Sequence, residues 1–193
     1  MNFYEDEKVM IKYIYSQKKF DWRFPNEHGL SERSLDCKQL GVMEVLKWQQ
    51  YEHIIPVFLN SFDCIADGLT LRSNEPVLRM GWEVSSHSIK SNEIDKAINS
   101  TVSREGYCLI YFDAYHMPLS SYFQTHNVVH WALVAGTDQQ HVFMVDYAGS
   151  PTFFKGQIGK IPWSEFISFW GHTEGGIGWI RQFSTSKKWD DEF

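Results

Sequence analysis

The amino-acid sequence predicts an α+β fold, in which helices come first and a mostly antiparallel sheet follows. A helix with a clear start signal is expected at residue 37, ahead of most of the strands. From residue 107 onward, apolar segments of strand length alternate with short polar turns. The chain has 193 residues, of which 43% are hydrophobic and 22% are charged. One domain with a substantial core, spanning residues 1–193, is therefore expected.

The overall charge and the cysteines exclude several classes of function. A formal net charge of −6 argues against nonspecific binding to nucleic acid or to an anionic membrane surface. No apolar run approaches the roughly 20 residues of a membrane span, and the acidic first ten residues lack the order of a signal peptide. Three widely spaced cysteines, Cys37, Cys64 and Cys108, indicate neither a disulfide framework nor a zinc finger. We expect a cytoplasmic protein.

The first expected helix begins at Cys37, in the segment SLDCKQLGVMEVLKW. Asp36 is a favourable N-cap, and Gln39 three residues later completes the capping-box pattern. The Cys37 sulfur would lie where free N–H groups and the positive end of the helix dipole converge, which favours thiolate over thiol. A cysteine here can instead be a small apolar residue. Gly41 predicts close backbone packing inside this helix, because glycine costs about 1 kcal/mol there relative to alanine. The positions expected to be buried are Leu40, Val42, Met43 and Leu46.

The remaining segments are assigned from periodicity and from turn residues. Before the central hairpin we expect a short helix starting at Pro56, a strand over 77–84, a helix over 91–103 that stops at Gly106, and a buried strand over 107–113. After the hairpin we expect a short strand over 152–155, a helix over 163–170 entered through Pro162, and a last strand over 178–183. Residues 1–30 are interpreted as an N-terminal arm, and residues 186–193 as a frayed tail. Cys64 and Cys108 lie in apolar segments and are expected in the core.

Residues 126–149 predict a β-hairpin, with apolar strands over 128–135 and 142–147 joined by the polar turn 136–140. With this five-residue loop, His130 lies directly opposite Asp146, which places their Cβ atoms about 4.5–5.5 Å apart. An imidazole and a carboxylate at that separation form a hydrogen bond that fixes the tautomer and supports the imidazolium. On the hairpin alone, the simpler interpretation is a partly buried histidine that pairs with a surface aspartate.

A metal site is a competing interpretation of the histidines in this region. His126 and His130, with Asp113 and His116 upstream, make a possible set of two histidines and a carboxylate. No HExxH motif accompanies them, and along a strand His126 and His130 would lie about 13 Å apart at roughly 3.3 Å per residue. We therefore predict no metal.

A cysteine at a helix start, followed along the chain by a strand histidine and a strand aspartate, is the order of papain-like thiol enzymes. The segments DCKQLGVMEVLKW, HWALVAG and VFMVDYAG resemble two related groups. These are the bacteriocin-processing, double-glycine-leader cysteine peptidases and the N-terminal domain of the butirosin-biosynthesis acyltransferase family. The second resembles the chain more, because LIYFDAYHMPLSSYFQTHNVVHWALVAGTDQQHVFMVD is similar to its strand, Asp-containing loop, His strand and Asp strand. The resemblance covers residues 30–185.

The resemblance implies a papain-like fold in which Cys37 is the nucleophile, His130 the base and Asp146 the residue that orients the base. It also implies that three residues of the loop after the buried strand border the acyl or acceptor site, namely Asp113, Tyr115 and Pro118. One position departs from the peptidase group, which carries a glutamine six residues before the nucleophile as an oxyanion donor. Ser31 stands there in this chain, so the Cys37 N–H supplies one donor and the second is unassigned.

The activity that the resemblance implies is acyl transfer from a thioester to an amine in secondary metabolism, without a cofactor. The donor thioester can be carried by an acyl or peptidyl carrier protein. Two alternatives stay open on the sequence. One is a cysteine peptidase or amidase of the same fold, and the other is a non-catalytic module that binds a peptide or a carrier protein.

Overall fold

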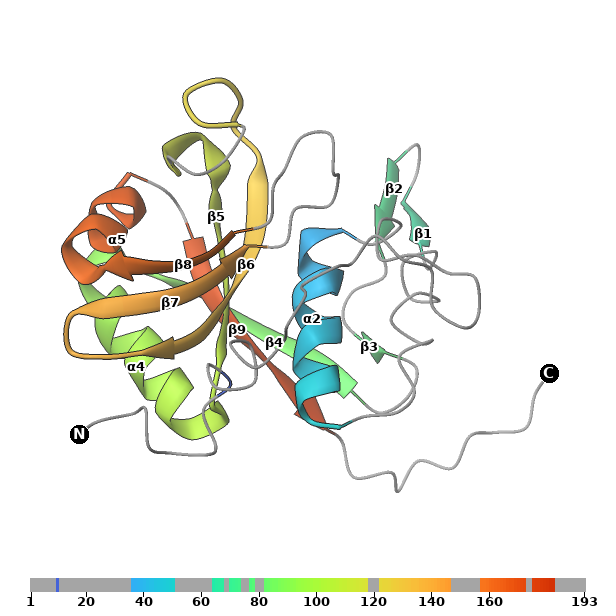
Figure 1. Ribbon diagram of the computed structural model, residues 1–193. Coiled ribbons are helices and arrows are strands. Elements are labelled where there is room, and N and C mark those ends of the chain that lie inside the picture. The colour runs from blue at the N-terminus through green and yellow to red at the C-terminus, as the bar shows by residue number, and fades with distance from the viewer. Residues whose placement is uncertain are drawn as a thin grey trace.

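The computed structural model describes Met10 and residues 36–50, 64–67, 70–73, 77–78, 82–117, 122–146, 157–172 and 175–182. These residues form an α+β arrangement of helices packed against a seven-stranded sheet (Figure 1). The predicted fold class is therefore confirmed at this level. None of the helices in the described ranges has the length and apolar character needed to cross a membrane.

The large sheet is antiparallel at every pair of neighbouring strands. Its strands, in spatial order, are β3 (Val77–Leu78), β4 (Trp82–Ile89), β9 (Gly175–Gln182), β5 (Cys108–Asp113), β6 (Val129–Thr137), β7 (His141–Asp146) and β8 (Gln157–Pro162). A separate antiparallel pair consists of β1 (Cys64–Asp67) and β2 (Thr70–Ser73). Because β9 lies between β4 and β5, the last described strand of the chain completes the centre of the sheet.

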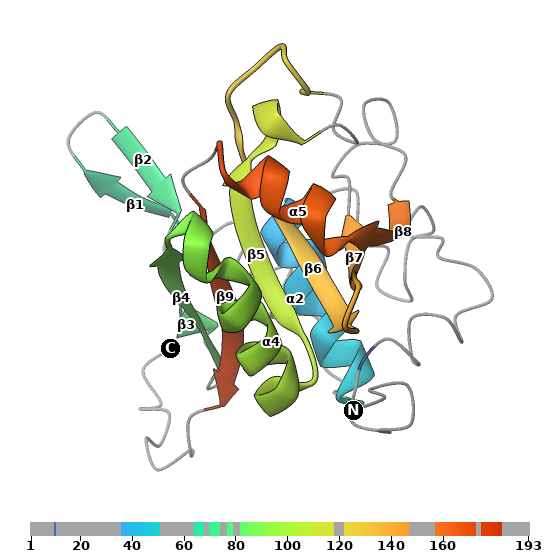
Figure 2. The ribbon, with the colours of Figure 1, turned by 90° about the vertical axis from the view of Figure 1, so that its left-hand side faces the viewer.

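Helices cover both faces of this sheet. Helix α2 (Cys37–Trp48) lies on one face, and α4 (Ile94–Glu105) and α5 (Trp163–Trp170) lie on the other (Figures 1 and 2). Side-chain contacts agree with this placement of α2 and α4 on opposite faces of the sheet. A Cβ atom on Gly41 of α2 would lie 3.0 Å from Leu109 Cδ2, whereas the neighbouring Cys108 hydrogen-bonds with Thr101 of α4. Adjacent residues of a strand point to opposite faces, so α2 and α4 enclose β5 from two sides.

Helix α2 is more deeply buried than the sequence predicts. The expected stripe of Leu40, Val42, Met43 and Leu46 is buried, but so is every other residue from 40 to 46. Even Glu44 is only 5% exposed. The close approach of Gly41 to β5 confirms the tight packing predicted at that position. α2 is therefore a central helix, and its N-terminus is held at a fixed place relative to the sheet.

Several other sequence predictions are confirmed with small shifts in their bounds. α5 has the predicted limits and follows Pro162 as its N-cap. The helix predicted over 91–103 begins with a 3-10 turn at Ser91–Glu93 (η3) and continues as α4. It ends at Gly106, whose φ of 83° is left-handed, the conformation for which a glycine stop is suited. Cys108 is fully buried in β5, as predicted.

Other predictions were wrong or lie outside the described residues. The single strand predicted over 77–84 is two strands, β3 and β4, which pair with each other. β9 begins at Gly175 instead of residue 178, and β8 was not predicted. The predictions for Pro56, for the strand over 152–155, for the side chain of Cys64 and for residues 186–193 concern positions outside the described part, as does all of the arm except Met10.

Candidate functional site

The start of α2 is fixed by a capping box that positions Cys37. Asp36 Oδ1 accepts a hydrogen bond from the Gln39 N–H at 2.7 Å, and Gln39 Oε1 accepts one from the Asp36 N–H at 2.9 Å. Both bonds were predicted from the sequence, and both are confirmed. Cys37 is thus the first residue of the helix, and its own N–H has no acceptor in the described part of the chain. That N–H and the positive end of the helix dipole both favour negative charge at this point.

His130 and Asp146 form a buried pair. His130 Nε2 lies 2.6 Å from Asp146 Oδ1, and each side chain is 5% exposed. The hydrogen bond predicted between them is therefore confirmed. Burial makes the pair more than a surface contact, because a charged group removed from water is stabilised only when it has a partner.

The register of the hairpin differs from the predicted one near its loop. Thr137 pairs with Val142, so only residues 138–141 lie between them and the loop is shorter than predicted. Next to the loop, each residue of β6 therefore pairs with a residue of β7 that is three positions later in the chain than predicted. A shift by an odd number reverses the face to which each side chain points. That shift alone would put His130 and Asp146 on opposite faces of the sheet. Tight turn bonds explain the shorter loop, since Asp138 Oδ1 accepts from the N–H groups of residues 140 and 141.

A β-bulge at Ala135 returns the two side chains to one face. The bulge places one extra residue in β6, and beyond it Leu133 pairs with Val145. The net displacement from the predicted register is therefore two positions, an even number. His130 and Asp146 are diagonal neighbours on the same face instead of direct opposites. Diagonal neighbours are about 7–8 Å apart at the backbone, a distance that a long side chain such as histidine bridges.

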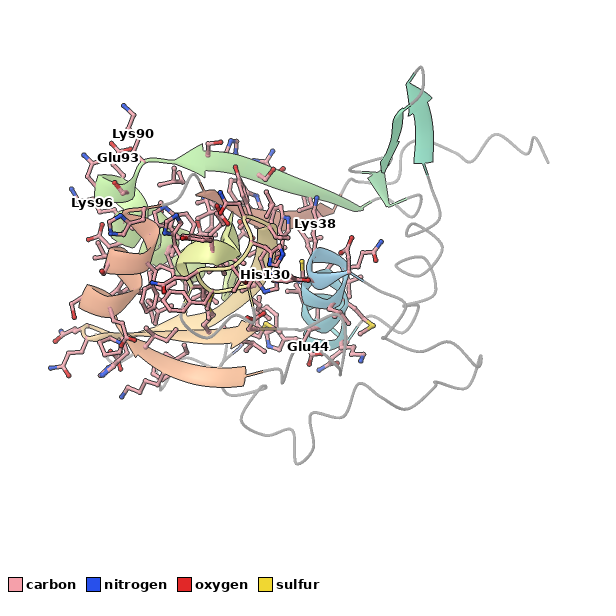
Figure 3. All side chains as sticks on the ribbon, turned by 90° about the horizontal axis from the view of Figure 1, so that it is seen from above. Lys38, Glu44, Lys90, Glu93, Lys96 and His130 are labelled. Atoms are coloured by element: carbon pink, nitrogen blue, oxygen red, sulfur yellow. The ribbon has the colours of Figure 1, made fainter. Side chains whose placement is uncertain are left out.

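The Cys37 thiol completes the group. The side chains of His130 and Cys37 are hydrogen-bonded, and the Trp131 N–H donates to Cys37 Sγ at 3.3 Å. Because Nε2 of His130 faces Asp146, Nδ1 is the ring nitrogen that is left to face the thiol. Figure 3 shows His130 beside α2, at the end of the helix that also carries Lys38. The three residues singled out from the sequence are thus in one place, in the order Cys37, His130, Asp146.

The charge of His130 depends on its two partners. Burial by itself lowers the pKa of His130, because a buried imidazolium loses its hydration. Hydrogen bonds and charges of Asp146 and Cys37 oppose this effect and raise the pKa from 6.5 to about 10. His130 therefore carries a proton at neutral pH, and its positive charge is placed between a carboxylate and the sulfur.

Aromatic side chains surround this group. Phe112 lies directly opposite His130 in the register of β5 and β6, and its ring meets the imidazole edge to face at 5.7 Å. On the next position of β6, the half-buried Trp131 packs against Tyr111 at 4.8 Å. The Lys38 ammonium lies 4.8 Å from the centre of the Trp131 ring. These residues exclude water from His130 and place a cation and an indole next to the thiol.

Of the three loop residues predicted to border the acyl or acceptor site, Asp113 and Tyr115 lie in the described part of the chain. Asp113 Oδ1 accepts hydrogen bonds from the N–H groups of Tyr115 at 3.0 Å and Val128 at 3.1 Å. Asp113 thereby caps the 3-10 turn Ala114–His116 (η4) and ties it to the start of β6. The Tyr115 ring packs on His116 at 5.0 Å. Pro118 lies outside the described residues. Contact of these three residues with a substrate remains a prediction.

A pocket opens next to this loop, under α5. Its apolar lining consists of Phe112, Met117, Met144, Phe166, Phe169 and Trp170, and Asp113 and His116 also border it. Sequence reasoning did not identify the pocket, because its residues come from three separate segments of the chain, 112–117, Met144 and 166–170. Among its apolar residues, Phe112 is the one with a usable signal, since the hairpin prediction places His130 in the strand that follows it.

The metal interpretation finds no support in the described residues. They contain no group of three His, Cys, Asp or Glu side chains that could hold a metal ion. His116 stacks on His172 at 5.7 Å, and His130 faces Asp146 and Cys37. Cys108 is not part of the site either, because burial raises the pKa of its thiol and the thiol donates to the Leu109 carbonyl.

No protein-family model matches the chain, and no curated protein matches it.

Proposed function

We propose that this chain is a thiol-dependent acyltransferase that takes an acyl group from a thioester and transfers it to an amine. The observation that carries the proposal is the hydrogen-bonded series Cys37, His130 and Asp146, with the thiol at a helix start and the other two side chains buried. A nucleophile, a base and an oriented carboxylate are what covalent acyl transfer requires. We further propose a papain-like fold, supported by a helix-borne cysteine that faces an antiparallel sheet carrying the histidine and the aspartate.

In the first step, the Cys37 sulfur attacks the acyl carbon of the donor. A carbon–sulfur bond forms to Cys37, and the bond to the donor sulfur breaks. His130, which is protonated at neutral pH because its pKa is raised to about 10, gives its proton to the departing thiolate. The Cys37 N–H is placed to donate to the oxygen of the tetrahedral intermediate, since it has no acceptor in the described residues.

In the second step, an amine attacks the acyl–Cys37 thioester. Acylation removes the negative charge from the sulfur, so the contribution of Cys37 to the raised pKa of His130 disappears. His130, now neutral, accepts the proton of the attacking amine, while Asp146 stabilises the imidazolium that forms. Collapse of the intermediate restores the Cys37 thiolate and releases the amide. Atoms, charges and protons balance over the two steps without a cofactor.

Transfer from a thioester is favoured over peptide hydrolysis by the chemistry of the oxyanion site. Only the Cys37 N–H is assigned as a donor, and Ser31, which replaces the glutamine of the peptidases, lies outside the described residues. Losing one donor typically costs about 100- to 1,000-fold in rate. A thioester tolerates such a loss better than an amide, because it is already activated and its leaving group needs less assistance.

The proposal is tested by intact mass spectrometry with small acyl thioesters. We expect one acyl adduct, located on Cys37 by peptide mapping, and decay of that adduct that speeds up with the concentration of added amine. Cys37→Ala should give no adduct, and Cys108→Ala should behave as the unmodified chain. Amine-independent decay combined with cleavage of ordinary peptides would instead indicate a peptidase. Absence of any adduct would favour a non-catalytic binding module.

A further inference from the structure

The pocket under α5 lies on the same face of the sheet as the His130–Asp146 pair. Phe112, one wall of the pocket, is the residue of β5 opposite His130 and touches its ring. Met144, another wall, is two residues before Asp146 in β7 and so points to the same face. Figure 2 shows α5 lying across β6 and β7 on this face, opposite α2. The His130 ring, the hydrogen-bond partner of Cys37, therefore touches the wall of the pocket.

The pocket suits a small and mostly apolar group. Its empty volume is about 290 Å³, part of it open to solvent, so only a short group fits. Methionine and aromatic side chains form most of its wall, and these adapt to apolar ligands of varied shape. Asp113 at its border disfavours a ligand that carries a carboxylate.

One polar atom in the wall lacks a partner. Trp170 is 2% exposed, and its indole N–H is buried without a hydrogen-bond acceptor in the part of the chain that the structure describes. A buried donor that has lost its water without gaining a partner destabilises the protein, and native structures retain few such donors. A ligand that brings an acceptor atom to this position would supply the missing bond. Trp170 is also one of the residues that line the pocket.

We propose that this pocket holds the acyl group during transfer, and that it selects a short apolar acyl chain with one neutral oxygen along the chain. That oxygen, a ketone or a hydroxyl remote from the thioester carbonyl, accepts a hydrogen bond from the Trp170 indole N–H. The inference rests on the proposed function, because it assigns the pocket to the acyl group of the same reaction. No additional chemical step is involved, since the acyl chain is bound without being changed.

The first experiment compares acylation of Cys37 by hexanoyl-N-acetylcysteamine with its 3-, 4- and 5-oxohexanoyl counterparts. We expect one oxo isomer to acylate Cys37 at least about tenfold faster than hexanoyl, as for other sites built around a hydrogen bond. Trp170→Phe should remove this preference, so that the favoured oxo isomer and hexanoyl acylate Cys37 of the variant at similar rates. Phe169→Trp, which fills the pocket, should slow all hexanoyl donors but not acetyl-N-acetylcysteamine. Ile167→Trp on the exposed side of α5 is the matched control and should change none of these rates.

Alkylation of Cys37 by iodoacetamide should be equal in all four proteins, which separates an altered pocket from an altered nucleophile. Equal rates for all the hexanoyl donors, with no effect of Phe169→Trp, would overturn the inference and leave the acyltransferase proposal standing. If no thioester acylates Cys37, the proposed function fails. A ligand-binding experiment then tests the pocket inference on its own. In ¹⁵N spectra, the Trp170 indole resonance, identified by its loss in Trp170→Phe, should shift on titration with 5-oxohexanamide. An unmoved resonance would overturn the pocket inference.

Discussion

Replacing Asp146 with asparagine tests the electrostatics of the site most directly. The substitution preserves the size of the side chain and an oxygen that can accept a hydrogen bond, but it removes the charge that faces His130. Burial is then opposed only by the hydrogen bond and charge of Cys37, so we expect the pKa of His130 to fall well below about 10. At pH 8 a larger fraction of the variant's imidazole would be neutral, whereas that of the unmodified protein would carry a proton.

The magnitude follows from the size of the pKa shift. A rise from 6.5 to about 10 corresponds to about 5 kcal/mol of preference of the folded protein for protonated His130. Because the folded state binds this proton more tightly than the unfolded state, the stabilisation is fully present below pH 6.5. It is lost as the pH rises through about 10. The free energy of unfolding should therefore decline by several kcal/mol from pH 6.5 to 10 in the unmodified protein, and much less in Asp146→Asn.

Two assays measure these effects. NMR titration of the His130 ring reports its pKa, and urea unfolding at a series of pH values reports stability. At neutral pH, Asp146→Asn should also slow iodoacetamide alkylation of Cys37 by about tenfold or more, because the imidazolium next to the sulfur is lost. Asp138→Asn is the matched control on the same hairpin, since Asp138 pairs with His141 at 3.0 Å but is 22% exposed. A His130 pKa near 6.5 in the unmodified protein would refute this reasoning.

Three further predictions follow from single contacts. Limiting iodoacetamide at neutral pH should label Cys37 before the buried Cys108, as read by peptide mapping; equal labelling would contradict an activated Cys37. Gly176→Ala should destabilise the protein by about 1–3 kcal/mol or more in urea unfolding, because a Cβ there would lie 2.5 Å from a tyrosine ring. Gly159→Ala should be nearly neutral, since nothing lies within 4 Å of its added Cβ, and similar losses in both would argue against this packing. In the Tyr115→Ala variant, Cys37 should be acylated at a near-normal rate, but the acyl group should pass from Cys37 to amines slowly. A normal rate of transfer to amines would exclude this residue from the acceptor site.

The parts of the site that the sequence predicts well are those that local chemistry determines. The start of α2 depends on Asp36 and Gln39, which lie within four residues of each other, so the capping box is visible without any tertiary information. The stop of α4 at Gly106 is local in the same way. Alternating apolar residues and turn residues identify β6 and β7, but their exact pairing depends on how the loop closes.

The parts that the sequence does not predict depend on contacts between distant segments. The position of β9 between β4 and β5 joins residues that are 65 to 100 positions apart in the chain, and no local pattern encodes that choice. The wall of the pocket combines Phe112, Met144 and Trp170 from two strands and a helix. Trp170 was expected within a helix, but its unpartnered indole N–H is a property of the packed structure alone.

The bulge at Ala135 explains how a wrong register gave the right pair. Formation of the pair requires only that His130 and Asp146 share a face of the sheet, which depends on whether the displacement is even or odd. The tight turn introduces an odd displacement, and the bulge makes it even. Removing the extra residue at 135 while keeping the turn would direct Asp146 away from His130, and the imidazole would then be buried without its carboxylate. The geometry of the site thus depends on an irregularity in β6, five residues from the histidine that it positions. Bulges next to active sites commonly direct a side chain in this way.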